Sequence, residues 1–113
     1  MTTVTYDYTV GTTAPIKLPV VVDYRYNDKD ASMVTGKVVV SQLGMYGPWN
    51  YSFEATLAEC PNEECLEDSR ILVLIVKDDA NNCVTLDYDN KWISKNYGHR
   101  DRAVLEALID AFS

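Results

Sequence analysis

The sequence predicts an α+β fold in which a mainly antiparallel sheet of about six strands curls around, or packs on, a single C-terminal helix. Several segments alternate apolar and polar residues with a period of two, turn-forming residues separate them, and only the last segment has a helical period. At 113 residues the chain can bury one core. No linker divides it, so residues 1–113 are expected to form a single domain.

The first two strands are predicted from strict alternation. Apolar residues occupy every second position over residues 4–10 and again over residues 16–26, with a break at 11–15. Pro19 lies inside the second run and cannot donate a hydrogen bond to a neighbouring strand. We therefore expect this strand to lie at an edge of the sheet or to carry a bulge there.

Four further strands are expected after the turn at 27–30. They span residues 33–43, 50–58, 71–76 and 83–88. Residues 71–76 contain no polar member, so this strand is expected to be central and covered on both faces.

The chain closes with a predicted helix over residues 101–112, for which Asp101 is a plausible N-cap. Its apolar residues recur at helical spacing and form one stripe. A helix of this length covers one face of a sheet only. The other face of residues 71–76 must then meet a second sheet, a strongly curled part of the same sheet, or a second copy in a homodimer.

The net charge of −7 lies entirely in residues 59–89, which carry nine acidic and two basic residues. The rest of the chain is neutral. A field of this sign repels nucleic acid and anionic membranes and steers the protein towards basic surfaces. We therefore expect a basic protein as partner, with neither nucleic acid nor membrane bound directly.

This charge predicts a small, non-catalytic acidic protein that binds and inhibits a basic nucleic-acid-handling protein, as phage counter-defence and immunity proteins do. Asp87 and Asp89 would project from one strand face about 7 Å apart, roughly two phosphate steps, so nucleic-acid mimicry is one route. The expected partner-binding carboxylates are Glu63, Glu64, Glu67, Asp68, Asp78, Asp79, Asp87 and Asp89. The expected loop aromatic anchors are Tyr46, Trp49 and Trp92.

Two alternatives remain open. In the first, the acidic residues only aid solubility, and the eight tyrosines form sheet faces through which a structural or assembly module self-associates. In the second, Cys60, Cys65, Cys83 and His99 form a Cys₃His zinc site, because the first two cysteines have zinc-knuckle spacing.

No cofactor and no enzymatic activity are expected. The chain contains one histidine, in a polar segment, and lacks phosphate-loop, nucleophile-elbow and metal-hydrolase motifs. It has no apolar run of about 20 residues and its N-terminal segment does not resemble a signal peptide. A cytoplasmic location, where cysteines stay reduced, is therefore expected.

Overall fold

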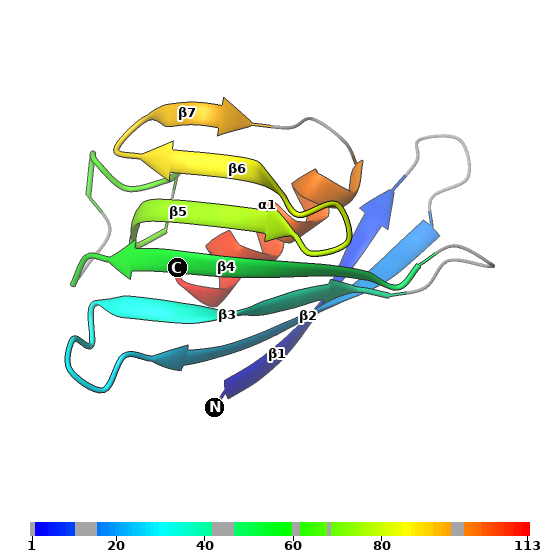
Figure 1. The fold of residues 1–113 in the computed structure, drawn as a ribbon, viewed down its shortest axis with the longest axis horizontal. Helices are drawn as coiled ribbons and strands as arrows, with labels where there is room; N and C mark the ends of the chain where they lie inside the picture. The colour runs from blue at the N-terminus through cyan, green and yellow to red at the C-terminus, as the bar shows by residue number, and fades with distance from the viewer. Residues whose placement is uncertain (1, 11–15, 42–46, 60–61, 68, 96–98) are drawn as a thin grey trace.

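A computed structural model describes residues 2–10, 16–41, 47–59, 62–67, 69–95 and 99–113. Within these residues, seven strands form one antiparallel sheet whose strand order is the chain order, followed by one helix (Figure 1). The elements are β1 (Thr2–Val10), β2 (Ile16–Tyr26), β3 (Met33–Val40), β4 (Trp49–Leu57), β5 (Ile71–Asp78), β6 (Cys83–Asp89), β7 (Trp92–Lys95) and α1 (His99–Ala111).

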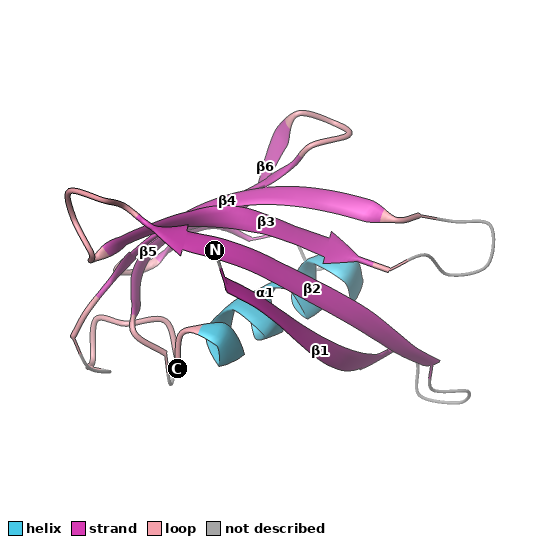
Figure 2. Ribbon diagram, turned by 90° about the horizontal axis from the view of Figure 1, so that it is seen from below, coloured by secondary structure: helices cyan, strands magenta, loops and turns pink. Residues whose placement is uncertain are grey.

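The predicted α+β fold is confirmed. Figure 2 shows the sheet curving over α1, which lies against one face, here called the inner face. Strand alternation places the fully buried Val20, Val22, Val34 and Val38 on that face. They pack in one core with Val104 and Leu108 of α1 and with Phe112, which follows it.

Aromatic rings fill the space between the inner face and the end of the helix. The Phe112 ring centroid lies 4.8 Å from that of Tyr24 and 6.0 Å from that of Phe53. Gly36 lies on β3, between Tyr24 on β2 and Phe53 on β4. A Cβ atom at Gly36 would be 2.0 Å from the Asp23 carbonyl oxygen on β2. The close approach of β2 and β3 therefore requires glycine.

The fifth predicted strand is central, as expected, but the described residues of the chain cover only one of its faces; that a second copy covers the other stays a prediction. Leu74 and Val76 are fully buried on the inner face, whereas Ile75 is 40% exposed on the other, outer face. In the described part of the chain, the outer face carries no second layer. An apolar run therefore marked a strand with one covered face.

Three smaller expectations also differ. The helix begins at His99, so Asp101 lies in its first turn, where an acidic side chain still complements the helix dipole, and is not the N-cap. Pro19 causes neither an edge nor a bulge, because β2 pairs on both sides without a register shift. Pairing with β3 ends at Val20, so the missing N–H of Pro19 interrupts no ladder. The short strand β7 adds to the six expected.

Candidate functional site

Three connections of the sheet, those between β2 and β3, β4 and β5, and β6 and β7, lie at one end of the molecule (Figure 1). Backbone hydrogen bonds join them to their neighbours: Leu57 N donates to Ser32 O over 2.7 Å, and Asn90 N to Leu72 O over 3.1 Å. We call this the acidic end. Its exposed carboxylates are those of Asp28, Asp30, Glu59, Glu63, Glu64, Glu67 and Asp89, accompanied by the basic residues Lys29, Arg70 and Lys91.

The longest of these connections, the β4–β5 loop, is anchored in the protein core. Leu66 is 2% exposed, and its N–H donates to Ile71 O over 2.8 Å. Ser69 is fully buried; its hydroxyl donates to Leu66 O and accepts from Ile71 N. Within the described part of this loop, the buried hydroxyl of Ser69 is therefore satisfied internally and helps to hold the backbone next to Leu66.

Two further bonds tie the loop to other elements. The Tyr88 hydroxyl on β6 donates to Glu64 O over 3.0 Å, and Arg70 N donates to Phe112 O over 2.8 Å. Burial, followed by the neighbouring Cys65, raises the pKa of Tyr88, so its hydroxyl stays protonated and able to donate at neutral pH. The side chains of Glu63, Glu64 and Glu67 thus project to solvent from a fixed backbone.

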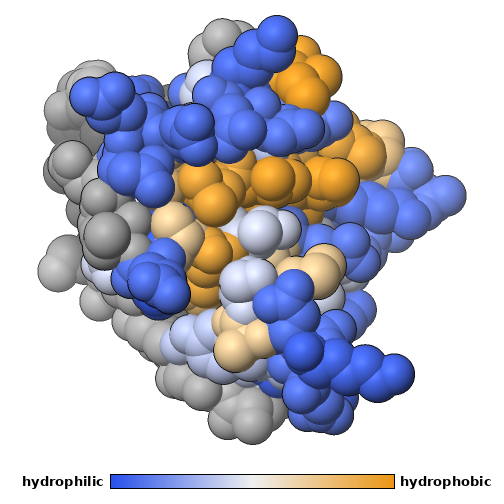
Figure 3. Space-filling model, turned by 90° about the vertical axis from the view of Figure 1, so that its left-hand side faces the viewer, coloured by the Kyte–Doolittle hydropathy of each residue, from blue (hydrophilic) through white to orange (hydrophobic). Residues whose placement is uncertain are grey.

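The shorter β2–β3 turn is held by its own side chains. Asn27 Oδ1 accepts from Lys29 N and Asp30 N, and Asp30 Oδ1 accepts from both the N–H and the hydroxyl of Ser32. These bonds from Ser32 lower the pKa of Asp30. Figure 3 views the acidic end directly and shows hydrophilic residues surrounding a band of hydrophobic ones.

The structure brings together only part of the predicted carboxylate set. Glu63, Glu64, Glu67 and Asp89 lie at the acidic end, whereas Asp78 and Asp79 lie at the opposite end of β5. Asp68 lies outside the described residues.

The two separated residues make internal contacts. Asp78 accepts from Ala80 N and from the Asn81 side chain, at 3.0 and 2.9 Å. Asp79 accepts from the Ser52 hydroxyl at 2.7 Å and pairs with Lys37 at 3.4 Å.

Asp87 and Asp89 lie on the same face of β6, as expected, since they pair with Ile75 and Val73 on the outer face. Asp87 is half-buried and Asp89 exposed. Sequence reasoning missed Asp28, Asp30 and Glu59, although a signal existed: in an up-and-down sheet, alternate connections share an end.

The predicted aromatic anchors do not lie in described loops. Trp49 begins β4, and Trp92 begins β7; both are half-buried and pack against the core. The Trp92 ring centroid lies 5.3 Å from that of Tyr88 and 4.8 Å from Lys95 Nζ. Tyr46 lies outside the described residues. The two tryptophans are therefore partly used in the fold itself.

Tyrosines contribute mainly to the core where their side chains are described. Tyr51 and Tyr88 are buried, and Tyr24 is half-buried against Phe112. Tyr26 is exposed on the β2–β3 side of the acidic end. A broad tyrosine surface for self-association is thus not seen among residues 19–41, 47–59 and 69–95.

The expected zinc set is not brought together. Cys65 is buried in the β4–β5 loop, whereas Cys83 is exposed at the opposite end of β6, whose seven residues span about 20 Å. These two thiols therefore cannot ligate one ion. Cys60 and the His99 side chain lie outside what the structure describes, and the described residues contain no group of three or more potential metal ligands.

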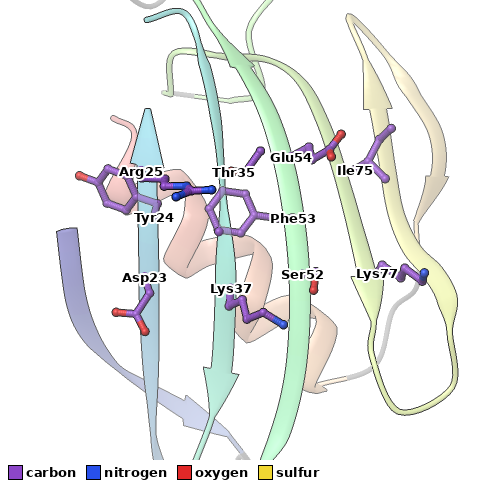
Figure 4. Close-up of a pocket in the computed structure, with 11 residues that line it drawn as sticks. Asp23, Tyr24, Arg25, Thr35, Lys37, Ser52, Phe53, Glu54, Ile75 and Lys77 are labelled. Atoms are coloured by element: carbon purple, nitrogen blue, oxygen red, sulfur yellow. The ribbon is translucent and has the colours of Figure 1, made fainter. Parts of the chain in front are cut away.

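A shallow concavity of about 720 Å³ lies on the outer face above β2 to β5 (Figure 4). Its charged lining residues are Asp23, Arg25, Lys37, Glu54 and Lys77. Positive and negative groups are mixed over the concavity as a whole: Arg25 and Lys37 lie on β2 and β3 and Lys77 near the far end of β5, whereas Glu54 lies directly across from Ile75.

Comparisons with protein-family models, curated proteins and solved structures found no match. None of the described helical residues forms a segment long and apolar enough to cross a membrane. Functional inference for this chain therefore rests on its own side chains.

Proposed function

We propose that this chain is a small non-catalytic inhibitor that binds a basic, nucleic-acid-handling protein through its acidic end. One observation carries the proposal: loops far apart in sequence present seven exposed carboxylates at one end of the sheet, against three basic residues. The proposed partner is a phage counter-defence or toxin–immunity target, whose basic nucleic-acid surface would be covered.

Preorganisation supports this role. A backbone that is already ordered in the free protein loses little conformational entropy on binding, so only the rotamers of the exposed side chains remain to be ordered. The β4–β5 loop meets this condition because Leu66 and Ser69 fix its backbone while Glu63 and Glu64 remain in solvent. Such carboxylates act mainly on the association rate and on the choice of partner.

The test begins with capture. The immobilised protein is passed through a lysate of its own host, or of phage-infected host cells, at about 50 mM and then about 500 mM salt, which shortens the range of charge interactions several-fold. We expect a basic nucleic-acid enzyme to be retained only at low salt. The purified enzyme is then assayed for nucleic-acid binding, which the inhibitor should prevent.

Matched variants separate a local site from net charge. Glu64→Lys and Glu106→Lys each raise the net charge by the same amount, but Glu106 is exposed on α1. We expect the Glu64 variant to weaken binding at least fivefold and the Glu106 variant less than twofold, since fivefold is about 1 kcal/mol. The triple variant Glu63→Lys/Glu64→Lys/Glu67→Lys should abolish capture. Equal effects of the two single variants, or undiminished capture by the triple variant, would contradict the proposal.

A further inference from the structure

The outer face of the sheet exposes an apolar surface next to the acidic end. Strand register aligns Met33 on β3, Thr56 on β4 and Val73 on β5 in one row across the sheet. Ile75 follows Val73 on the same face of β5. We call these four residues the outer patch. Met33 is 41% and Ile75 40% exposed, while Thr56 and Val73 are half-buried.

Apolar side chains that are exposed close together can mark an interaction site. It also supplies what the acidic end lacks, since Trp92 is partly packed into the fold and Trp49 lies at the opposite end of β4. Carboxylates alone give attraction and orientation, whereas apolar anchors provide most of the binding free energy at an interface.

Carboxylates flank Val73 and Ile75, the β5 part of the outer patch, on both sides. Glu54 on β4 lies directly across from Ile75, and Asp87 on β6 lies across from Ile75 on the other side; Asp89 is likewise paired with Val73. Figure 4 shows Glu54 and Ile75 on neighbouring strands. Since strands are about 4.8 Å apart, the two carboxylate rows are separated by about 10 Å.

That separation matches an α-helix, whose diameter with side chains is about 10–12 Å. A helix lying along β5 would place an apolar ridge on Val73 and Ile75. Lys or Arg side chains on its two flanks would then reach Glu54 on one side and Asp87 or Asp89 on the other. Recognition of a helix by its ridge residues at i, i+3, i+4 and i+7 is a common binding mode.

We propose that the outer patch is the docking site for a basic amphipathic helix of the partner protein. This inference rests on the proposed function and names the element of the partner that is recognised. A second copy of this chain does not fit as well, because matching outer patches would bring like-charged carboxylates together. An anionic membrane is disfavoured for the same reason.

The probe is a synthetic helical peptide with leucines at i, i+3, i+4 and i+7 and lysines on both flanks. A peptide of identical composition with the leucines scattered is the control for charge alone. Titration of the full-length, isotopically labelled protein should shift amide signals of residues 54–56, 73–75 and 87–89. The scattered peptide should bind at least tenfold more weakly, about 1.4 kcal/mol.

Two exposed apolar residues provide matched protein variants. Ile75→Lys removes the apolar anchor and adds a positive charge that repels the lysines of the peptide. It should raise the Kd of the peptide with the leucine ridge at least tenfold. Val84 is 48% exposed on β6 and is paired with Lys77, away from the outer patch. Val84→Lys should therefore change the Kd of the same peptide less than twofold. Ile75→Ser tests the anchor without added charge, and dispersed amide spectra show that each variant is folded.

Several outcomes would overturn the inference. These are equal Kd values for the two peptides, equal effects of Ile75→Lys and Val84→Lys, shifts confined to the β4–β5 loop, or a protein dimer that Ile75→Lys dissociates. The natural partner separates the two proposals. If Glu63→Lys/Glu64→Lys/Glu67→Lys abolishes its capture and Ile75→Lys does not, the acidic end binds the partner and the outer patch does not.

Discussion

The β4–β5 loop and the β5–β6 hairpin turn are both acidic and lie at opposite ends of the same strand, yet their carboxylates have different roles. In the hairpin turn, Asp78 and Asp79 accept hydrogen bonds from the turn and from β4, and Asp79 pairs with Lys37. In the β4–β5 loop, buried groups such as Leu66 and Ser69 hold the backbone, and the side chains of Glu63 and Glu64 remain in solvent.

This difference shows that acidic composition does not by itself identify a binding surface. A carboxylate whose oxygens already accept internal hydrogen bonds would lose those bonds on binding a partner, and the loss offsets the gain. A carboxylate without such bonds has no such cost; at the acidic end Asp30 is the exception, because its Oδ1 accepts from Ser32. The hairpin turn is therefore structural, and the loop is the better candidate for recognition.

The largest expected effect comes from removing the anchor of the loop. Leu66→Ala should lower the free energy of unfolding by about 2–5 kcal/mol, because it leaves a cavity in a fully packed site. The matched change on the hairpin side, Val84→Ala, should cost less than about 0.5 kcal/mol since Val84 is largely exposed. Urea unfolding of both variants measures the difference, and similar midpoints would mean that the loop is not anchored as described.

A smaller effect is expected at the bond between the loop and β6. Tyr88→Phe removes the hydroxyl that donates to Glu64 O and should cost about 0.5–1.5 kcal/mol at neutral pH.

The pH dependence at this residue has a defined sign. Burial raises the pKa of Tyr88 above its ordinary value of 10.0, so its contribution to stability is fully present below pH 10 and is lost as the pH rises through the folded-state pKa. Unfolding experiments between neutral and strongly alkaline pH should therefore show that the difference in free energy of unfolding between wild type and Tyr88→Phe becomes smaller above pH 10. A constant gap would argue against the buried, hydrogen-bonded tyrosine.

The smallest effects distinguish the two kinds of carboxylate directly. Asp79→Asn should destabilise the protein by about 0.5–1 kcal/mol, and by less at high salt, because its ion pair with Lys37 is partly exposed. Glu63→Gln should stay within about 0.5 kcal/mol of wild type and should instead weaken capture of the partner. If Asp79→Asn weakened capture and Glu63→Gln lowered stability, the hairpin turn would be the binding region and the β4–β5 loop the structural one.

Most of the fold could be predicted because period-two alternation and helical spacing are local signals. The predicted bounds of the second strand, residues 16–26, coincide with those of β2. The short β7 escaped prediction, since four residues with a single exposed apolar side chain, Ile93, show no clear period. The apolar run in β5 could not show what covers each face, because that depends on neighbouring layers.

The candidate site was predicted only in part for a similar reason. Sequence identifies acidic loops, but the end of the sheet at which each loop lies follows from strand order and direction. Glu63 and Asp89 share an end with Asp28 because an even number of strands separates their connections, whereas Asp78 lies in the intervening hairpin. The outer patch could not be foreseen, since it depends on the register that aligns Met33 with Val73.

The helix that fills the inner face follows all seven strands in the chain. During synthesis the ribosome therefore releases a complete set of strands before the thirteen residues that shield their apolar face have emerged. Until then, residues such as Val22 and Val38 are open to association with other chains or with chaperones. Covering of the inner face thus waits for an element that is synthesised after the whole sheet.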